Sequence, residues 1–420
     1  MILAVSRLLQ LSGNRHQFCL HRRNTFDMNN FYRLILLLVF ACNNFFQASA
    51  QFENQRVKVA VFTPLYLSDA FDGSNYKLGK SNLPKNILPG LEFYNGIMLA
   101  IDSLNNEGVN AEISIYDSKQ DPMDIERLFS EPAMQDVGLI IAALTTASEL
   151  KYFGAKALQK NIPFVSATYP NYVGITQNPS FILLNSSFGT HIEGLYKYMQ
   201  RNYSASEIIA FKRPGSTEDY IKNTITDLNK RTSTSPIKIR WVDMKDDFIS
   251  NDVTKYLDSL KSNVIFVASP LEIFGANVVK TIGKNSKYNV TAIGMPTWDA
   301  VRDFNRREYE NVEIIYSTPF NYSSNEYLNR SITKEYKYKY KSRPSDMVFK
   351  GFETTYHFTK LLQKHRQNLL ANLSDKEFTV FNNFDIQPVK LKKSNTLPDF
   401  LENKKLYFVK KRGGNVMSIY

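Results

Sequence analysis

The chain has 420 residues, of which 43% are hydrophobic and 22% charged, enough apolar material for more than one buried core. Its formal net charge is +12, but no arginine-rich tract or stacked aromatic motif accompanies that charge, so nucleic acid is excluded as a partner. Both cysteines, Cys19 and Cys42, lie among the first fifty residues. The rest of the chain therefore has no disulfide, thiolate metal site or cysteine nucleophile.

The first fifty residues have the pattern of an export signal. Arg33 precedes an apolar run over residues 34–41, and the small residues Ala48-Ser49-Ala50 follow, as a signal peptidase requires. The run is shorter than the about 20 apolar residues that span a bilayer. We therefore expect cleavage near Ala50 and a periplasmic or extracellular location.

Two details of this leader leave alternatives open. Met28 opens a conventional signal sequence, and we take it as the true start. Residues 39–42 resemble a lipoprotein box that would anchor the chain to lipid at Cys42. Phe40 is bulky for such a box, so cleavage near Ala50 is favoured. Removing residues 1–50, which carry five arginines and one aspartate, lowers the net charge from +12 to +8.

The remaining residues alternate between short apolar runs and helical patterns. The run at 138–143 is apolar without alternation, which is typical of a strand buried on both faces of a parallel sheet. Repeated strand–helix–strand units give parallel sheets with right-handed crossovers, so the fold class is α/β, doubly wound. The expected strands are 57–62, 111–116, 137–144, 163–167, 207–211, 237–242, 264–268, 290–294 and 312–317.

Helical spacing is clearest at Tyr94, Ile97, Met98, Ile101 and Leu104, which share one face. The regular rhythm gives way after about residue 318 to a long helical region. That region includes helices over 326–340 and 351–363, and late strands are expected at 378–389 and 406–420, the second turning at Gly413-Gly414.

The order of these pieces resembles the type I periplasmic-binding-protein family, in its branched-chain amino-acid substrate-binding branch. The resemblance rests on six stretches, which are 57–66, 93–104, 137–148, 162–168, 292–298 and 344–362. It implies two Rossmann-like lobes joined by three crossings, with a hinge and a ligand cleft between them. Lobe 1 would take residues 52–185 and about 320–370, and lobe 2 would take 186–319 and about 371–420.

Ligands of open α/β sheets bind at the carboxyl ends of strands and against helix N-termini. The resemblance assigns the ligand's carboxylate and amine to the loops after two strands of lobe 1. Plain helix capping by Thr146 or Ser148, and ordinary packing of the tyrosines, are the alternatives. The candidates in lobe 1 are Tyr66, Thr145, Thr146, Ser148, Ala167, Thr168 and Tyr169.

The facing wall would come from loops that follow strands of lobe 2. Asp299 or Glu272 could pair with an ammonium group, although Glu272 also suits a solvated helix start. The candidates in lobe 2 are Arg213, Ser216, Pro270, Glu272, Trp298 and Asp299. An insertion over residues 67–89 is longer than a standard strand-to-helix turn and would overhang the cleft, which puts free amino acids as the ligand in doubt.

No catalytic motif, metal site or cofactor site is expected. Only His191, His357 and His365 follow the leader, and neither an HExxH pair nor a GxSxG elbow is present. The first hypothesis is a monomeric exported protein that captures a small polar solute, possibly for a membrane transporter. The second is a scaffold or regulatory protein of the cell envelope that binds a protein or wall component, and the third is an enzyme.

Overall fold

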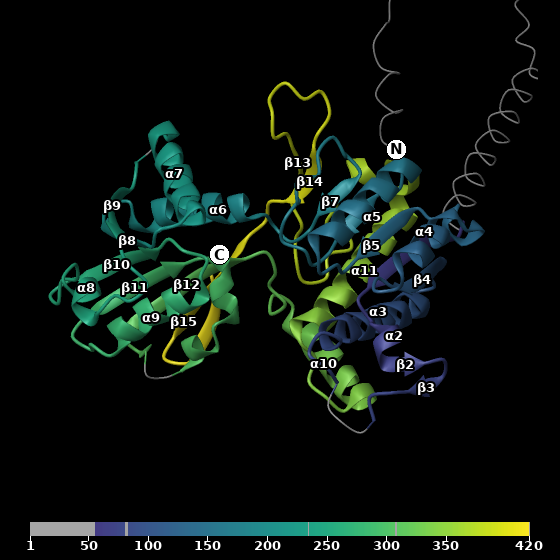
Figure 1. The fold of residues 1–420 in the computed structure, drawn as a ribbon, viewed down its shortest axis with the longest axis horizontal. Coiled ribbons are helices and arrows are strands. Elements are labelled where there is room, and N and C mark those ends of the chain that lie inside the picture. The colour runs from purple at the N-terminus through teal and green to yellow at the C-terminus, as the bar shows by residue number, and fades with distance from the viewer. Residues whose placement is uncertain (1–54, 80–82, 234, 307–308, 420) are drawn as a thin grey trace, which may run out of the picture. The chain divides into compact units, whose positions relative to one another are not determined.

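The computed structural model describes residues 55–79, 83–233, 235–306 and 309–419, drawn as a coloured ribbon in Figure 1. The expected leader, the start at Met28, the lipid site at Cys42 and the cleavage site near Ala50 lie outside these residues. Within them, no helix combines the length and apolar character that a membrane crossing needs.

The first sheet has seven strands, six of them parallel. The one antiparallel pair, at the edge, joins β13 to β14. In sheet order, the strands are β13 (Ile386–Val389), β14 (Phe400–Asn403), β7 (Phe181–Leu183), β6 (Phe164–Ser166), β5 (Leu139–Ala142), β1 (Val57–Thr63) and β4 (Ala111–Asp117).

The second sheet also has seven strands, and its antiparallel pairs again lie at one edge, where β15 pairs with β12 and β16 with β15. In sheet order, the strands are β16 (Asn415–Ile419), β15 (Tyr407–Arg412), β12 (Val312–Thr318), β11 (Asn289–Gly294), β10 (Ser262–Val267), β8 (Glu207–Lys212) and β9 (Lys238–Asp243).

The two sheets share one topology. In each, five parallel strands are ordered so that the second strand of the series lies outside the first, and the third, fourth and fifth follow on the other side. The order reverses between β1 and β5 in the first sheet and between β8 and β10 in the second. In open α/β sheets, the carboxyl ends of the strands at such a reversal form the usual ligand position.

Helices cover both faces of each sheet (Figure 1). On the first sheet, α3 (Leu88–Asn106) and α11 (Asp346–His365) pack on one face, and α4 (Pro122–Ser130) and α5 (Ala147–Lys160) on the other. On the second, α6 (Phe188–Tyr203) and α7 (Ser216–Arg231) cover one face, and α8 (Ser250–Thr254) and α9 (Glu272–Gly283) the other. Helix α10 (Glu326–Tyr340) packs beside α3 and α11.

The α/β class and the expected strands of both sheets are confirmed, with ends shifted by at most two residues. Helix α10 has the expected bounds, and α11 starts five residues earlier than expected. The expected strand over 378–389 is wrong except for β13, because the preceding residues Val380, Phe381 and Phe384 pack as irregular chain against α11.

The assignment of residues from about 371 onward to lobe 2 is wrong for residues up to 403. Strand β14 pairs in parallel with β7, with Leu401 opposite Ile182, so it extends the first sheet. Leu373 and Phe384 lie in the core of that sheet. Only β15 and β16 join the second sheet, and the chain therefore crosses between the sheets once more, after Asn403. The other lobe boundaries stay a prediction.

The insertion over 67–89 begins as a short helix, α2 (Leu67–Ala70), followed by a small hairpin of β2 (Phe71–Asp72) and β3 (Asn75–Tyr76). The rings of Phe71 and Tyr76 meet edge to face across the hairpin at 5.5 Å. Both side chains are largely exposed. The role of the insertion as an overhang stays a prediction.

Two glycines let α3 and α11 approach backbone to backbone. A Cβ atom on Gly96 would lie 2.1 Å from the carbonyl oxygen of Val348, and one on Gly351 would lie 2.2 Å from that of Phe93. Side chains at these positions would push the helices apart. The contact attaches α11 to the first sheet although five strands of the second sheet separate it from β7 in the sequence.

We expect Gly351→Ala to lower the free energy of unfolding by about 1–3 kcal/mol, because the added methyl group overpacks a contact between backbones. Urea unfolding followed by circular dichroism measures the change. The control is Asn105→Ala at an exposed position of α3, where a change within about 0.5 kcal/mol is expected. Equal unfolding midpoints for the two variants would contradict the role given to the glycine contact.

Candidate ligand-binding site

A buried carboxylate holds together the loops that follow β1 and β4. Asp117, at the end of β4, accepts hydrogen bonds from the backbone N–H groups of Leu65 at 2.9 Å, Leu67 at 2.8 Å and Lys119 at 2.9 Å. Tyr66 lies between the first two donors in a left-handed conformation, with φ 52°. The position of Tyr66 is thus set by Asp117.

Lys119 connects Tyr66 with the loop after β5. Its Nζ donates to Thr145 Oγ1 at 2.6 Å and pairs with Glu149 Oε1 at 2.5 Å. The same ammonium lies 5.4 Å from the centre of the Tyr66 ring. Three loops at the point where the strand order reverses therefore meet at one cation, which the sequence analysis did not single out.

The N-terminus of α5 is closed by its own side chains. Thr146 caps the helix and accepts from the Glu149 N–H, while Glu149 Oε2 accepts from the N–H of Thr146 at 3.0 Å and of Thr145 at 3.2 Å. Ser148 Oγ lies 3.1 Å from Thr146 Oγ1. The capping alternative is therefore confirmed for Thr146. An incoming carboxylate would meet the carboxylate of Glu149 at this position.

The loop after β6 lies beside this cluster. Thr168 Oγ1 donates to the carbonyl of Leu144 at 3.0 Å, next to Thr145, and the Thr168 carbonyl accepts from Asn185 at 2.8 Å. Ala167 is fully buried, and its N–H bonds to Ala142 within the sheet. That N–H is consequently not free for a ligand, which corrects the expectation for Ala167.

Tyr169 is partly buried against the core between the first sheet and helices α4 and α5, where Tyr152 also packs. This position agrees with the packing alternative. Six of the seven candidates after strands of the first sheet retain some solvent exposure, and Ala167 is the exception.

In the second sheet, Arg213 follows β8 and is already paired. Its Nε and Nη2 form a two-bond contact with Asp246, both at 2.7 Å, and its Nη1 lies 3.2 Å from Glu218 Oε1. The nearly buried Glu218 also accepts from Ser269 at 2.7 Å, at the end of β10. The carboxylate of Glu218, in the first turn of α7, therefore pairs with Arg213, much as Glu149 of α5 pairs with Lys119 on the first sheet.

Three other candidates flank this cluster. Ser216 is exposed at the first position of α7, and Glu272 is exposed at the first position of α9. The Pro270 carbonyl accepts from Thr297 Oγ1 at 2.9 Å, which links the loops after β10 and β11. The side chains of Ser216 and Glu272 remain accessible to a ligand.

Trp298 does not line a surface, and this expectation is wrong. Its side chain is fully buried in the core of the second sheet and packs edge to face with Phe304 at 5.0 Å. The absence of side chains at Gly275 and Gly294 makes room for the indole, since a Cβ at either would lie 2.2 Å from it. Gly294 lies four residues before Trp298, but Gly275 belongs to α9, and the sequence around Trp298 does not indicate that this helix leaves room for the indole.

Asp299, the next residue, is exposed and accepts a hydrogen bond from the Tyr316 hydroxyl at 2.8 Å. It also lies within electrostatic range of the first turns of α11. Burial and then the charge of Asp299 raise the pKa of Asp346. Burial lowers the pKa of Lys350 to about 8, against the opposing effects of Asp346 and Asp299. The charge of Asp299 therefore affects the ionisation of both Asp346 and Lys350.

The residues missed by sequence reasoning have different signals. Glu149 forms, with the candidate Thr146, a T-x-x-E capping box that is readable in the sequence. Lys119 could have been found as the residue that follows a strand next to β1. Tyr316 and Asp346 have no local signal, because Tyr316 is brought near Asp299 by the pairing of β11 with β12, and Asp346 lies 47 residues later in the sequence.

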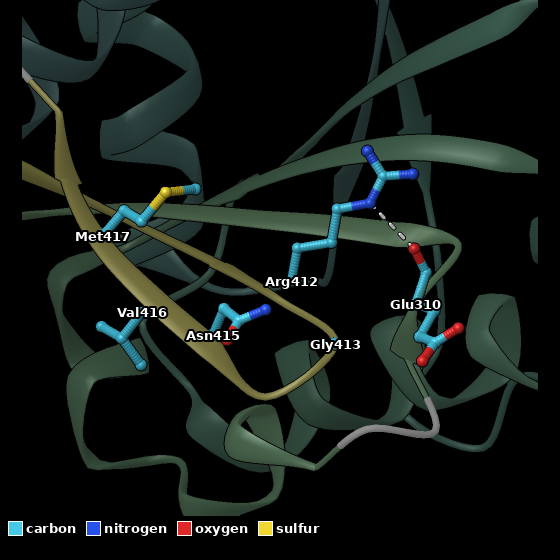
Figure 2. A pocket seen from close by; sticks show the side chains of 6 residues that line it. All are labelled: Glu310, Arg412, Gly413, Asn415, Val416 and Met417. Atoms are coloured by element: carbon cyan, nitrogen blue, oxygen red, sulfur yellow. Dashed lines mark hydrogen bonds between the residues drawn. The ribbon is translucent and has the colours of Figure 1, made fainter.

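A separate depression lies on the second sheet, away from the carboxyl ends of its strands (Figure 2). It has a volume of about 610 Å³ and surrounds the turn between β15 and β16. Arg412 Nε donates to the Glu310 carbonyl at 2.9 Å beside it. Lys411 is paired with Ile314, near the start of β12, so the depression lies at the amino ends of the parallel strands. None of the candidate residues lines it.

Among the described residues, no cluster of His, Asp or Glu suits a metal ion.

We expect Glu149→Gln to cost about 1 kcal/mol of stability at neutral pH, the typical value of a helix cap. Burial opposes ionisation, but hydrogen bonds from Lys119 and Thr146 lower the pKa of Glu149 below 4.5. A lowered folded-state pKa stabilises the fold above the unfolded pKa, and this contribution is lost as pH falls through the folded value. The difference between wild type and variant should therefore shrink below about pH 4.3.

Urea unfolding at several pH values measures this difference. Glu131→Gln is the control, because Glu131 is exposed at the end of α4. A difference between wild type and Glu149→Gln that stays constant from neutral to acidic pH would contradict an ionised, hydrogen-bonded Glu149.

No known family model matches the sequence, and no curated protein matches it. Solved structures do match. A putative branched-chain amino acid ABC transporter protein from Rhodospirillum rubrum superposes with a TM-score of 0.62 at 12% identity, covering 87% of this chain and 100% of that one. A branched chain amino acid ABC transporter periplasmic ligand-binding protein from Burkholderia xenovorans gives 0.56 at 14% identity, covering 87% and 94%.

An ABC transporter substrate-binding protein from Desulfitobacterium hafniense in complex with Leu gives a TM-score of 0.53 at 14% identity, covering 87% of this chain and 100% of that chain. All three alignments span both sheets. At these identities the likeness concerns the fold. The chain therefore has the fold of the type I periplasmic binding proteins, and in fold it resembles their branched-chain amino-acid substrate-binding members.

Proposed function

We propose that this protein is an exported, non-catalytic binding protein that holds a small polar ligand between the carboxyl-end edges of its two sheets. One observation carries the proposal. Both sheets have the same strand order, and polar side chains gather at the reversal of each, around Lys119 in the first and Arg213 in the second. Such reversals are where open α/β sheets bind ligands.

The charges at these edges favour a ligand that carries an amine. Asp299 is exposed and hydrogen-bonded to Tyr316, and its charge acts on Asp346 at the start of α11. An ammonium group placed by Asp299 would relieve the repulsion between the two carboxylates. The solved structure from Desulfitobacterium hafniense holds Leu, which makes amino acids and their derivatives the first ligands to test.

The N-terminus of α5 argues against a free carboxylate as the second recognised group. Glu149 already accepts the N–H groups that would bind such a carboxylate, and it is paired with Lys119. A ligand carboxylate would have to displace Glu149 or be repelled by it. We therefore propose that the ligand is an amine without a free carboxylate, such as an amide or a peptide-like compound.

A role in ABC-transporter uptake from the periplasm, as a monomer, is the finer proposal, and it is supported by the likeness in fold to transporter-associated proteins. The alternative is an envelope scaffold that binds a protein or wall component. That alternative is favoured by the internal pairing of Glu149 with Lys119 and of Glu218 with Arg213, and by the capping box that satisfies the start of α5 without a ligand.

We expect leucinamide to raise the thermal stability of the full chain more than leucine does, because only leucine presents a carboxylate to Glu149. A ligand at 100 times its dissociation constant should add about 2.7 kcal/mol. Asp299→Asn should remove the shift, because the amine loses its charged partner. Differential scanning calorimetry measures both.

Asp303→Asn is the matched control, because Asp303 is an exposed aspartate four residues away that pairs with Arg306 at 2.9 Å. It should keep the shift. A larger shift with leucine would contradict the amine proposal and support an ordinary amino-acid site. No shift with leucine, leucinamide, dipeptides or wall fragments would favour the scaffold role.

A further inference from the structure

The loop between β13 and β14, residues 390–398, combines apolar and basic side chains at the tip of a hairpin. Its sequence is Lys-Leu-Lys-Lys-Ser-Asn-Thr-Leu-Pro. Leu391 and Leu397 are 45% and 56% exposed. In Figure 1 the yellow loop extends well past the strands that carry it. Leu391 and Leu397 lie on the two arms of this projecting loop, and two exposed leucines so close together are unusual for a surface that meets only water.

The loop is held in one shape by a buried aspartate. Asp399 accepts from the backbone N–H of Leu391 at 2.7 Å and that of Gln177 at 3.1 Å, and from the Asn395 amide at 2.8 and 3.0 Å. Lys390 Nζ donates to the Thr396 carbonyl at 3.1 Å. Because the loop is ordered in advance, a partner that binds it has little conformational entropy to remove.

Three lysines surround the leucines, at positions 390, 392 and 393. Among the described residues, none of these lysines forms an ion pair within 4.0 Å, although Lys392 acts electrostatically on Asp399. Asp399 is fully buried, so the outer surface of the loop presents positive charge. Lysines can extend their ammonium groups to a charged layer while neighbouring apolar side chains enter a less polar one.

The loop lies away from the proposed ligand position. Strand β14 begins at Phe400 and runs parallel to β7, so the loop is at the amino ends of the parallel strands. Strand β1 also begins at this edge, at Val57. Tyr66 and Thr145 follow the carboxyl ends of their strands, at the opposite edge. A surface that contacts the loop would therefore leave the ligand edge free.

We propose that the loop over residues 390–398 docks the protein on an anionic lipid bilayer, with Leu391 and Leu397 entering the headgroup layer and the three lysines contacting lipid phosphates. Lipid is favoured over a protein partner because the loop projects past its strands (Figure 1) and its leucines are exposed, so a flat bilayer can receive it and no groove is needed. The positive charge complements anionic headgroups. This inference is independent of the proposed ligand.

The test is co-sedimentation of the full chain with vesicles of equimolar phosphatidylglycerol and phosphatidylcholine, and with vesicles of phosphatidylcholine alone. The wild type should bind the anionic vesicles more tightly, and salt should weaken that binding. The triple variant Lys390→Gln, Lys392→Gln and Lys393→Gln should bind them on the order of 100-fold more weakly, since each lysine near an anionic surface contributes about fivefold. Leu391→Ser with Leu397→Ser should weaken binding by about tenfold or more.

The matched control removes three positive charges near α9, which covers the second sheet, by the substitutions Lys280→Gln, Lys284→Gln and Lys287→Gln. These lysines are exposed; Lys280 lies in the last turn of α9, and Lys284 and Lys287 follow the helix. The control should bind as the wild type does, and thermal unfolding should be the same for all variants. The proposal is overturned if the two lysine variants lose binding equally, if the leucine variant binds as the wild type does, or if the wild type does not prefer anionic vesicles.

Discussion

Parallel strand pairing is the constraint on which the site depends. When β4 and β5 pair in parallel with β1, all three strands end at the same edge, and the loops that follow them must meet there. Asp117 then ties two of these loops together through backbone N–H groups, and Lys119 reaches the third. The same order in the second sheet brings Arg213 and Ser269 to Glu218. The chemistry at each edge is thus a result of topology.

At both edges, internal ion pairs occupy part of the charge before any ligand arrives. Helices α5 and α7 each carry a glutamate in the first turn, Glu149 and Glu218, and each of the two pairs with a nearby basic side chain. Ion pairs of this kind are stabilising when hydrogen bonds satisfy the remaining lone pairs, as they do for Glu149. A ligand must compete with these internal contacts, whereas the exposed carboxylate of Asp299 is open to a new charged partner. For this reason, we place the ligand's amine at Asp299 and not at a helix N-terminus.

Two of the connections between the sheets, those after β7 and β14, meet at the buried carboxylate of Glu402. Glu402 accepts from the Ser187 N–H at 2.7 Å and from Thr190 at 2.6 Å, and it pairs with Lys404 at 2.5 Å. Burial opposes its ionisation, but Lys404 lowers the pKa of Glu402 below its ordinary value. The residues that leave the first sheet after β7 and those that leave it after β14 therefore share one anchor. The chain at these two crossings is held by hydrogen bonds to Glu402 and is not a flexible linker.

Local patterns in the sequence determined the fold class, the parallel strands and helix α10, because burial on both faces and helical spacing are written in neighbouring residues. They also indicated Tyr66, Thr145 and Asp299 as polar residues after strands. Tertiary structure alone decided three other features. Strand β14 joins the first sheet by pairing with β7, which lies over 200 residues earlier. Trp298 enters the core because Gly275 of α9 leaves room for its indole, and the charge of Asp299 acts on Asp346 of α11. Each depends on residues distant in sequence, and spacing along the chain carries no record of such contacts.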